Sequence, residues 1–309
     1  MNFDLILGTH EDQSLKLIEH LITTNDIKLH DDLKTHRNAV RLMTSLITGN
    51  CETWKEMLAP EEFFITEIVS NKLCNIDVDK LDYLIRDHYH VKEHVKTLKP
   101  FMAFLKNARV VNDGNGTSHI GYNSDDFELI ENMFWNRANF HMNIYQNLKV
   151  IGVERMVRDI CVHGAVGGVT IDNLKLTDAH QNCDAYVHLD DSVLDLIKNS
   201  GIKNASVLKA QEILQDLQES RYYRYVCDDP SLIEILVAKF GAIFCIIDKV
   251  IPNAEVPSNI PLYNGSSELV SMKSDDSLGY KASMIYSVES DEVTFDNIKN
   301  FIDVLNNNV

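Results

Sequence analysis

The most informative segment of the sequence is Ile76-Asp-Val-Asp-Lys-Leu-Asp-Tyr-Leu-Ile-Arg-Asp-His-Tyr-His90. Its apolar residues recur at three- and four-residue steps, which predicts a helix over residues 76–90. One face of that helix is expected to be polar, with Asp79, Tyr83, Asp87 and His90. The core-facing side is expected to carry Val78, Leu81, Leu84 and Ile85. The polar face combines carboxylates, a phenol and an imidazole, a set suited to a metal, a sugar hydroxyl and phosphate oxygens.

A plainer interpretation of the same face is a solvated helix surface on which Asp82 and Arg86 pair four residues apart. A second predicted helix, from Ser124 to about His163, repeats the chemistry with Arg137, His141 and Tyr145 at steps of four. Two helices with stripes of this kind favour a shared cleft. Spacing alone leaves both interpretations open.

On both sides of residues 76–90, the spacing of apolar residues is typical of a mainly α-helical protein. Further helices are expected near residues 9–24, 31–48, 61–72, 92–109, 190–198, 207–225 and 295–305. Residues 110–122 place short β-like runs around a Gly/Asn/Asp turn, which predicts a hairpin. Beyond Pro230, runs at 242–250 and 281–288 are strand-like. We therefore expect a large helical domain over 1–228 and a small α+β lobe over 229–309.

The composition of the 309-residue chain restricts the function classes. It is 45% hydrophobic with a formal net charge of −17, which argues against a general nucleic-acid or anionic-membrane surface. Its six cysteines are scattered without a CxxC pair, as expected for reduced thiols in an intracellular protein. The first residues do not resemble a signal peptide, and no stretch approaches the roughly 18 apolar residues of a membrane span.

The residues in and around 76–90 resemble the sequences of a known family. Phe63–Lys72, followed by Ile-Asp-Val-Asp-Lys over 76–80 and Asp-Tyr…Arg-Asp over 82–87, is similar to the core of the sterile-alpha-motif and HD-domain dNTP triphosphohydrolases of animals. The similarity continues through 108–110, 133–146 and 222–226. It spans about residues 9–228, and a weaker similarity covers residues 233–263.

This resemblance implies an HD-domain-like helical bundle and a hydrolytic reaction. In that family, a metal held by two histidines and two aspartates polarises the α-phosphate, and attack by water releases the deoxynucleoside and triphosphate. By resemblance, Asp79 is the last ligand of a divalent metal (Mn, Mg, Fe or Zn). His10, in Thr-His-Glu, is a catalytic acid near the leaving oxygen, a role that suits imidazole.

The resemblance also implies a dNTP-binding site, with dGTP as the test substrate, and a nuclear location, the cytoplasm being the other intracellular choice. Lys80, Tyr83 and Arg137 would contact the phosphates. Asp87 would accept a hydrogen bond from the sugar 3′-hydroxyl. Tyr145 would lie against the sugar, with Gln146 close by.

The chain departs from the family at the metal. The family's first ligands precede Thr-His-Glu, but only eight residues lie before Thr9 here, so three of the four ligands are missing. His30-Asp31 follows that motif, and we interpret it as a surface pair. One carboxylate cannot hold a catalytic divalent ion. We therefore expect the metal not to be retained and the chain alone to be inactive.

Two explanations of this departure stay open. Either an upstream segment supplies the ligands, or the chain is a degenerate paralogue that binds a nucleotide without catalysis or forms oligomers with an active relative. The second is favoured because basic residues of the family's regulatory sites are replaced. The replacing residues are Ala103, Asn123, Asp125, Met142, Asn143 and Leu148. A plain helical interaction module is a third alternative.

Overall fold

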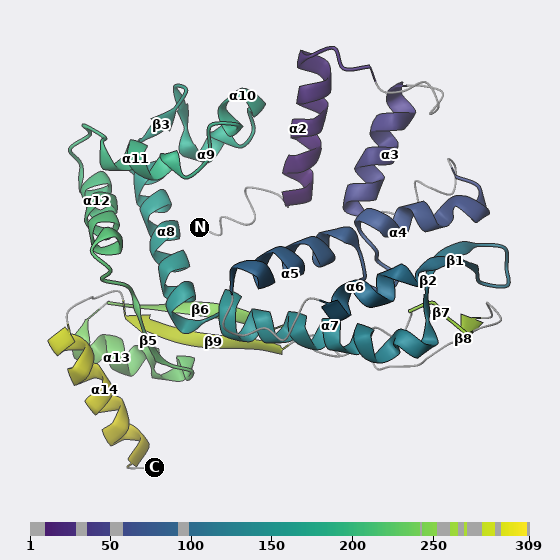
Figure 1. The fold of residues 1–309 in the computed structure, drawn as a ribbon. Coiled ribbons are helices and arrows are strands. Elements are labelled where there is room, and N and C mark those ends of the chain that lie inside the picture. Colours follow the sequence, from purple (N-terminus) through teal and green to yellow (C-terminus); the bar gives the residue numbers. More distant parts are fainter. Residues whose placement is uncertain are drawn as a thin grey trace. The chain divides into compact units, whose positions relative to one another are not determined.

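The computed structural model describes residues 10–28, 36–49, 58–91, 99–241, 243–251, 260–264, 269–270, 280–287 and 292–307 (Figure 1). Its contacts divide the chain into two compact units, one of residues 1–139 and 253–278 and one of residues 140–252 and 279–309. This is a different partition from the domains expected at 1–228 and 229–309, which stay a prediction. The pair His30-Asp31 and the residues 92–98 lie outside the described ranges.

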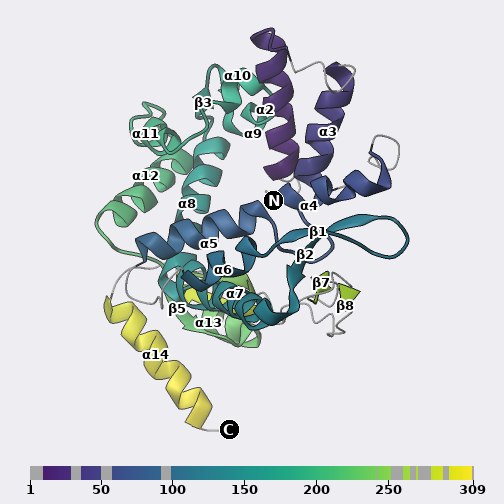
Figure 2. The same cartoon turned by 45° about the vertical axis from the view of Figure 1, so that its right-hand side comes forward.

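The first unit is built mainly of helices. Its elements are α2 (His10–Thr24), α3 (His36–Thr48), η3 (Pro60–Ile65), α4 (Thr66–Val69), α5 (Val78–His90), α6 (Lys99–Lys106), β1 (Arg109–Asn112), β2 (Ser118–Asn123), η4 (Ser124–Asp126), α7 (Phe127–Phe140, as far as Asn139), β7 (Leu262–Tyr263) and β8 (Leu269–Val270). Figures 1 and 2 show α5 above α7 within this unit.

The strands of the first unit form one small sheet in the order β1-β2-β7-β8. β1 and β2 are antiparallel, with Arg109 opposite Gly121 and Asn112 opposite Ser118, as predicted for a hairpin. β7 then joins β2 in parallel. A segment more than 130 residues further along the chain thus completes the sheet, which local sequence patterns do not predict.

The second unit combines helices with a three-stranded sheet. Its elements are η5 (His141–Tyr145), α8 (Leu148–Val166), β3 (Thr170–Ile171), β4 (Leu174–Lys175), α9 (Leu176–Ala179), α10 (Cys183–Tyr186), α11 (Ser192–Lys198), α12 (Ala205–Gln218), β5 (Arg224–Cys227), η6 (Pro230–Leu232), α13 (Ile233–Phe240), β6 (Phe244–Ile251), β9 (Tyr280–Ser287) and α14 (Glu292–Asn307). The sheet order is β5-β9-β6, and both pairings are antiparallel.

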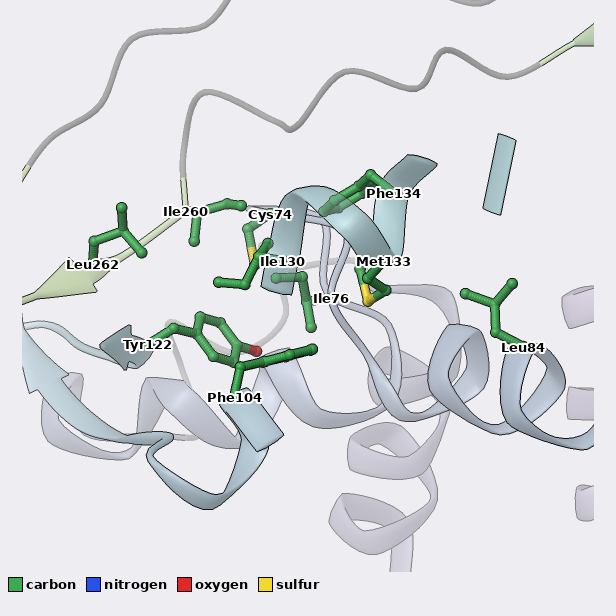
Figure 3. Packing of buried hydrophobic residues seen from close by; sticks show 10 residues of the cluster. All are labelled: Cys74, Ile76, Leu84, Phe104, Tyr122, Ile130, Met133, Phe134, Ile260 and Leu262. Carbon is green, nitrogen blue, oxygen red and sulfur yellow. The ribbon is translucent and has the colours of Figure 1, made fainter. Parts of the chain in front are cut away.

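The core of the first unit packs the start of α5 against α6, α7 and β2. Ten buried side chains form this cluster (Figure 3): Cys74, Ile76, Leu84, Phe104, Tyr122, Ile130, Met133, Phe134, Ile260 and Leu262. The rings of Phe104 and Tyr122 meet edge to face at 5.6 Å. Burial raises the pKa of the Cys74 thiol to about 12, so this cysteine is a neutral core residue.

The mainly helical fold class and its small α+β part are confirmed, but three predicted helices and one side-chain orientation are corrected. Residues 124–163 do not form one helix, because η4 precedes α7 and a π-turn, η5, separates α7 from α8. Residues 61–72 form a 3-10 turn and one short α-helix. Residues 224 and 225 belong to β5 rather than to a helix. Val78, expected in the core, is 49% exposed.

None of the helices in the described part of the chain contains an apolar stretch long enough to cross a membrane.

Candidate functional site

The start of α5 is fixed by the carboxylate of Asp77. It caps the helix by accepting a hydrogen bond from the Lys80 backbone N–H at 3.0 Å, and it accepts a second from the Lys80 Nζ at 2.8 Å. The backbone N–H of Asn71 donates a third at 3.1 Å. The Asp77 side chain is only 3% exposed and that of Lys80 is 20% exposed. Lys80, predicted to contact phosphates, is therefore held at the first turn of α5 by a buried carboxylate.

The turn before α5 is held by a second buried polar side chain. The Oδ1 of Asn71 accepts hydrogen bonds from the backbone N–H groups of Leu73 and Cys74, at 2.9 and 3.1 Å. Its Nδ2 lies 3.1 Å from the Cys74 Sγ. Sequence reasoning missed Asp77 and Asn71, although an aspartate directly before an apolar helical pattern is a common N-cap.

Tyr83 and Arg137 bring α5 and α7 together at a polar contact. The Nε of Arg137 donates a hydrogen bond to the Tyr83 hydroxyl oxygen at 3.1 Å. Burial raises the pKa of the Tyr83 phenol, and the nearby Arg137 partly offsets this. The phenol is therefore neutral at physiological pH. This contact joins one residue of each predicted stripe, and the shared cleft stays a prediction.

The other predicted residues of α5 are more exposed. Asp79, expected as a metal ligand and catalytic residue, is an exposed residue of the first turn. Asp87, expected at the sugar, is 29% exposed and lies 3.6 Å from the Arg86 Nε. Arg86 also pairs with Asp82 at 2.5 Å, and both side chains are more than half exposed. The solvated-face interpretation thus describes this side of α5, while Lys80 and Tyr83 lie on a more buried side.

The remaining predicted residues lie elsewhere. His10 is the first residue of α2, and its side chain is outside the described part of the chain. Tyr145 and Gln146 belong to the second unit, at the end of the π-turn. The Gln146 backbone N–H donates to the His141 carbonyl at 2.9 Å, and the rings of His141 and Tyr145 meet edge to face. Such π-turns occur often at functional sites.

The described donor set does not fit a divalent metal. Across the described ranges, no three His, Cys, Asp or Glu side chains gather in a way that could hold a metal ion. Asp79 is the one predicted ligand with a described position, and a single exposed carboxylate lacks the ligand number that such an ion requires.

A carboxylate–imidazole pair in the first unit was not predicted. Glu67 of α4 is buried, and its two carboxylate oxygens contact β2: Oε1 lies 2.6 Å from the His119 Nδ1, and Oε2 accepts from the Ile120 backbone N–H at 2.7 Å. The hydrogen bond with Glu67 raises the pKa of His119, and Asp113 adds to this effect. A glutamate and a histidine 52 positions apart leave no local sequence pattern that would reveal the pair.

The second unit contains a hollow of about 380 Å³ whose lining includes Lys149, Tyr222, Arg224 and Phe295. The Lys149 ammonium lies 4.6 Å from the centre of the Tyr222 ring. Leu148, which resemblance predicts at a regulatory position, also lines this hollow. The residues predicted for catalysis or substrate binding do not contribute to its lining.

Comparison with known proteins shows which proteins the chain is similar to. No family model matches it. It is 25% identical over 217 residues to the deoxynucleoside triphosphate triphosphohydrolase SAMHD1 homolog of Dictyostelium discoideum. This alignment covers 70% of the chain. It is 28% identical over 238 residues to SAMHD1 of Xenopus laevis and 27% identical over 232 residues to SAMHD1 of Homo sapiens, covering 70% and 71% of the chain. Over about 70% of its length, the chain is similar to deoxynucleoside triphosphate triphosphohydrolases of the SAMHD1 type.

The SAMHD1-like chain spans only part of its relatives. The matched regions cover 37% of the Dictyostelium and Xenopus proteins and 36% of the human protein. The resemblance to these triphosphohydrolases was predicted from the Ile-Asp-Val-Asp-Lys motif, and the comparisons confirm it. The roles of individual residues in this SAMHD1-like chain stay predictions.

Proposed function

We propose that the chain binds the polyphosphate of a dNTP on the α5–α7 face of the first unit, defined by Lys80, Tyr83 and Arg137. The observation that carries the proposal is the Arg137 Nε–Tyr83 contact, which places a guanidinium beside the helix that holds Lys80. Arginine and lysine form strong charge-assisted hydrogen bonds to phosphate oxygens. The family relationship supports a deoxynucleotide as the source of those oxygens, because the relatives are named as deoxynucleoside triphosphate triphosphohydrolases.

The Asp77–Lys80 pair is compatible with phosphate binding. An ammonium group has three N–H donors, and the carboxylate of Asp77 accepts one of them. Because Asp77 is buried and also caps α5, it holds the lysine near the positive end of the helix dipole. Both features favour an anion at the first turn of α5.

Asp87 is proposed to bind the sugar of the same dNTP. Asp87 follows Tyr83 by four residues on α5 and presents a partly exposed carboxylate, a suitable acceptor for a 3′-hydroxyl. A dNTP is therefore expected to bind more tightly than inorganic triphosphate.

We further propose that the described residues bind the nucleotide without hydrolysing it. Asp79 is the described residue that resemblance names as a metal ligand, and across the described ranges no group of three His, Cys, Asp or Glu side chains could hold a metal ion. The proposed role is then to bind dNTPs, or to form homo- or hetero-oligomers that modulate an active relative, in the nucleus by resemblance. The second candidate, triphosphohydrolase activity, is favoured by the names of the relatives.

Calorimetric titration of the full chain with dGTP tests binding. Arg137→Ala is expected to weaken binding by at least roughly tenfold, because a charge-assisted contact is lost. Arg158→Ala is the matched control, since this arginine is an exposed residue of α8. An equal loss in both variants, or no heat from the native chain, contradicts the proposal.

Incubation of the full chain with dGTP and either Mn²⁺ or Mg²⁺ tests the second candidate. Release of triphosphate at enzyme-like rates, abolished by Asp79→Ala, would establish hydrolysis and refute the non-catalytic role. Absence of triphosphate, together with calorimetric binding, supports that role.

A further inference from the structure

The contact between Tyr83 and Arg137 fixes the orientation of a guanidinium group. The Arg137 Nε–H donates to the Tyr83 hydroxyl at 3.1 Å across the two helices. A guanidinium is planar and has five N–H donors, so a hydrogen bond at Nε sets the plane of the group and leaves the four N–H groups of the two Nη atoms for other acceptors. Both residues are half-buried, which limits the competition from water.

The protonation state of Tyr83 suits this task. Burial raises the pKa of the phenol, so the ring does not become a phenolate that would neutralise the guanidinium charge. A neutral hydroxyl oxygen accepts the Nε–H and leaves the full positive charge of Arg137 for an anion.

Orientation matters because a flexible arginine loses rotamer freedom when it binds an anion. A guanidinium held by its Nε edge has lost part of that freedom before the ligand arrives, and preorganisation of this kind increases affinity. The Nη groups of such an arginine match two oxygens of one phosphate.

We propose that Tyr83 is a positioning residue that acts through Arg137, rather than an independent phosphate ligand. The inference rests on the proposed function, since the ligand of Arg137 is the polyphosphate of that proposal. By resemblance, Tyr83 and Arg137 would both contact phosphates, whereas here Arg137 binds the phosphate and Tyr83 orients Arg137. If Tyr83 acts through Arg137, its hydroxyl has no effect once the guanidinium is gone.

A double-mutant cycle on the full chain tests this dependence, with inorganic triphosphate as the calorimetric probe. Tyr83→Phe keeps the ring and removes the hydroxyl, and we expect a loss of affinity of about fivefold to tenfold. In the Arg137→Ala background, the same substitution is expected to change affinity by less than about twofold. Tyr89→Phe is the matched control, because Tyr89 on the same helix is 68% exposed.

A spectroscopic measurement on the unliganded chain separates positioning from general stability. The Arg137 Nε–H resonance, assigned by its loss in Arg137→Ala, is expected to be protected from solvent exchange in the native chain. That protection should disappear in Tyr83→Phe without a change in melting temperature. Loss of protection in Tyr89→Phe as well would indicate general loosening and overturn the positioning role.

The outcomes for the two proposals are distinct. A native chain that binds no triphosphate and no dGTP overturns the proposed function, and the positioning role with it. A native chain that binds, with an effect of Tyr83→Phe that persists undiminished without Arg137, overturns only the positioning role. Binding that is insensitive to Tyr83→Phe does the same.

Discussion

The Lys80 ammonium group lies 2.8 Å from the buried carboxylate of Asp77, which also caps the helix that carries Lys80. One carboxylate thus connects three elements of the candidate site: the turn after α4 through Asn71, the first turn of α5, and the cation expected to contact phosphate. Local structure and expected chemistry depend on the same side chain. Its removal should affect both stability and ligand binding.

Replacing Asp77 with alanine is expected to destabilise the chain by about 2–3 kcal/mol, because a helix cap is lost and buried N–H groups lose their acceptor. Asp79→Ala is the control, since Asp79 is exposed two residues further along the chain. It should change the free energy of unfolding by less than about 0.5 kcal/mol. Urea denaturation of both variants measures the difference, and equal effects would contradict the capping role.

Glu67 is expected to stabilise the β1–β2 hairpin. Its two oxygens bind the His119 ring and the Ile120 backbone, and the side chain is buried. Glu67→Ala is expected to cost about 2–4 kcal/mol, because the backbone N–H and the imidazole lose a charged acceptor. Glu61→Ala, at an exposed position nearby, is the control. Hydrogen exchange of the Ile120 amide should accelerate only in the Glu67 variant.

His119 should make the free energy of unfolding depend on pH at values above the ordinary pKa of a histidine. Its folded pKa is raised, first by the hydrogen bond with Glu67 and further by Asp113. A raised folded pKa means that the contribution is fully present below the unfolded value of about 6.5 and is lost as pH rises through the folded value.

The substitution His119→Asn isolates this titration, because its amide nitrogen can still donate toward Glu67 but does not ionise. The native chain should be more stable than His119→Asn at about pH 5.5, with a smaller difference at about pH 8.5. Melting temperatures of both proteins at the two pH values measure the effect. A difference that grows with pH would have the wrong sign and exclude the charged pair.

The sequence predicted what depends on local periodicity. The helices around residues 10–24 and 78–90, the hairpin and the strands near 244–251 and 280–287 follow from apolar spacing and turn residues. The break between α7 and α8 did not follow, because apolar residues continue in helical register through the π-turn at 141–145. A π-turn changes the hydrogen-bond partners without interrupting that pattern.

The candidate site was predictable only in part. Tyr83 and Arg137 were singled out by spacing and resemblance, and their contact lies where two polar stripes were expected to meet. Asp77 was missed because buried carboxylates are uncommon, and an aspartate so close to Asp79 suggests an exposed acidic run. Glu67 and His119 were missed because their contact depends on tertiary structure.

Gly152 allows α8 to pack closely against the start of β5. A Cβ at this position would lie 2.6 Å from the carbonyl oxygen of Tyr223, a backbone atom. That backbone has little room to move, because the Tyr223 N–H donates to the Met156 Sδ and its hydroxyl donates to Asp159. The close approach therefore requires a glycine, although glycine is a poor helix former.

Gly152→Ala is expected to destabilise the chain by about 1–3 kcal/mol, because the clash exceeds the gain of about 1 kcal/mol in helix propensity. Gly201→Ala is the control, since a Cβ added at Gly201 would meet no other atom within 4 Å and no clash arises there. Equilibrium unfolding in urea, followed by circular dichroism, compares the two. If Gly152→Ala were more stable than the native chain, propensity would outweigh packing, and α8 would lie further from Tyr223 than described.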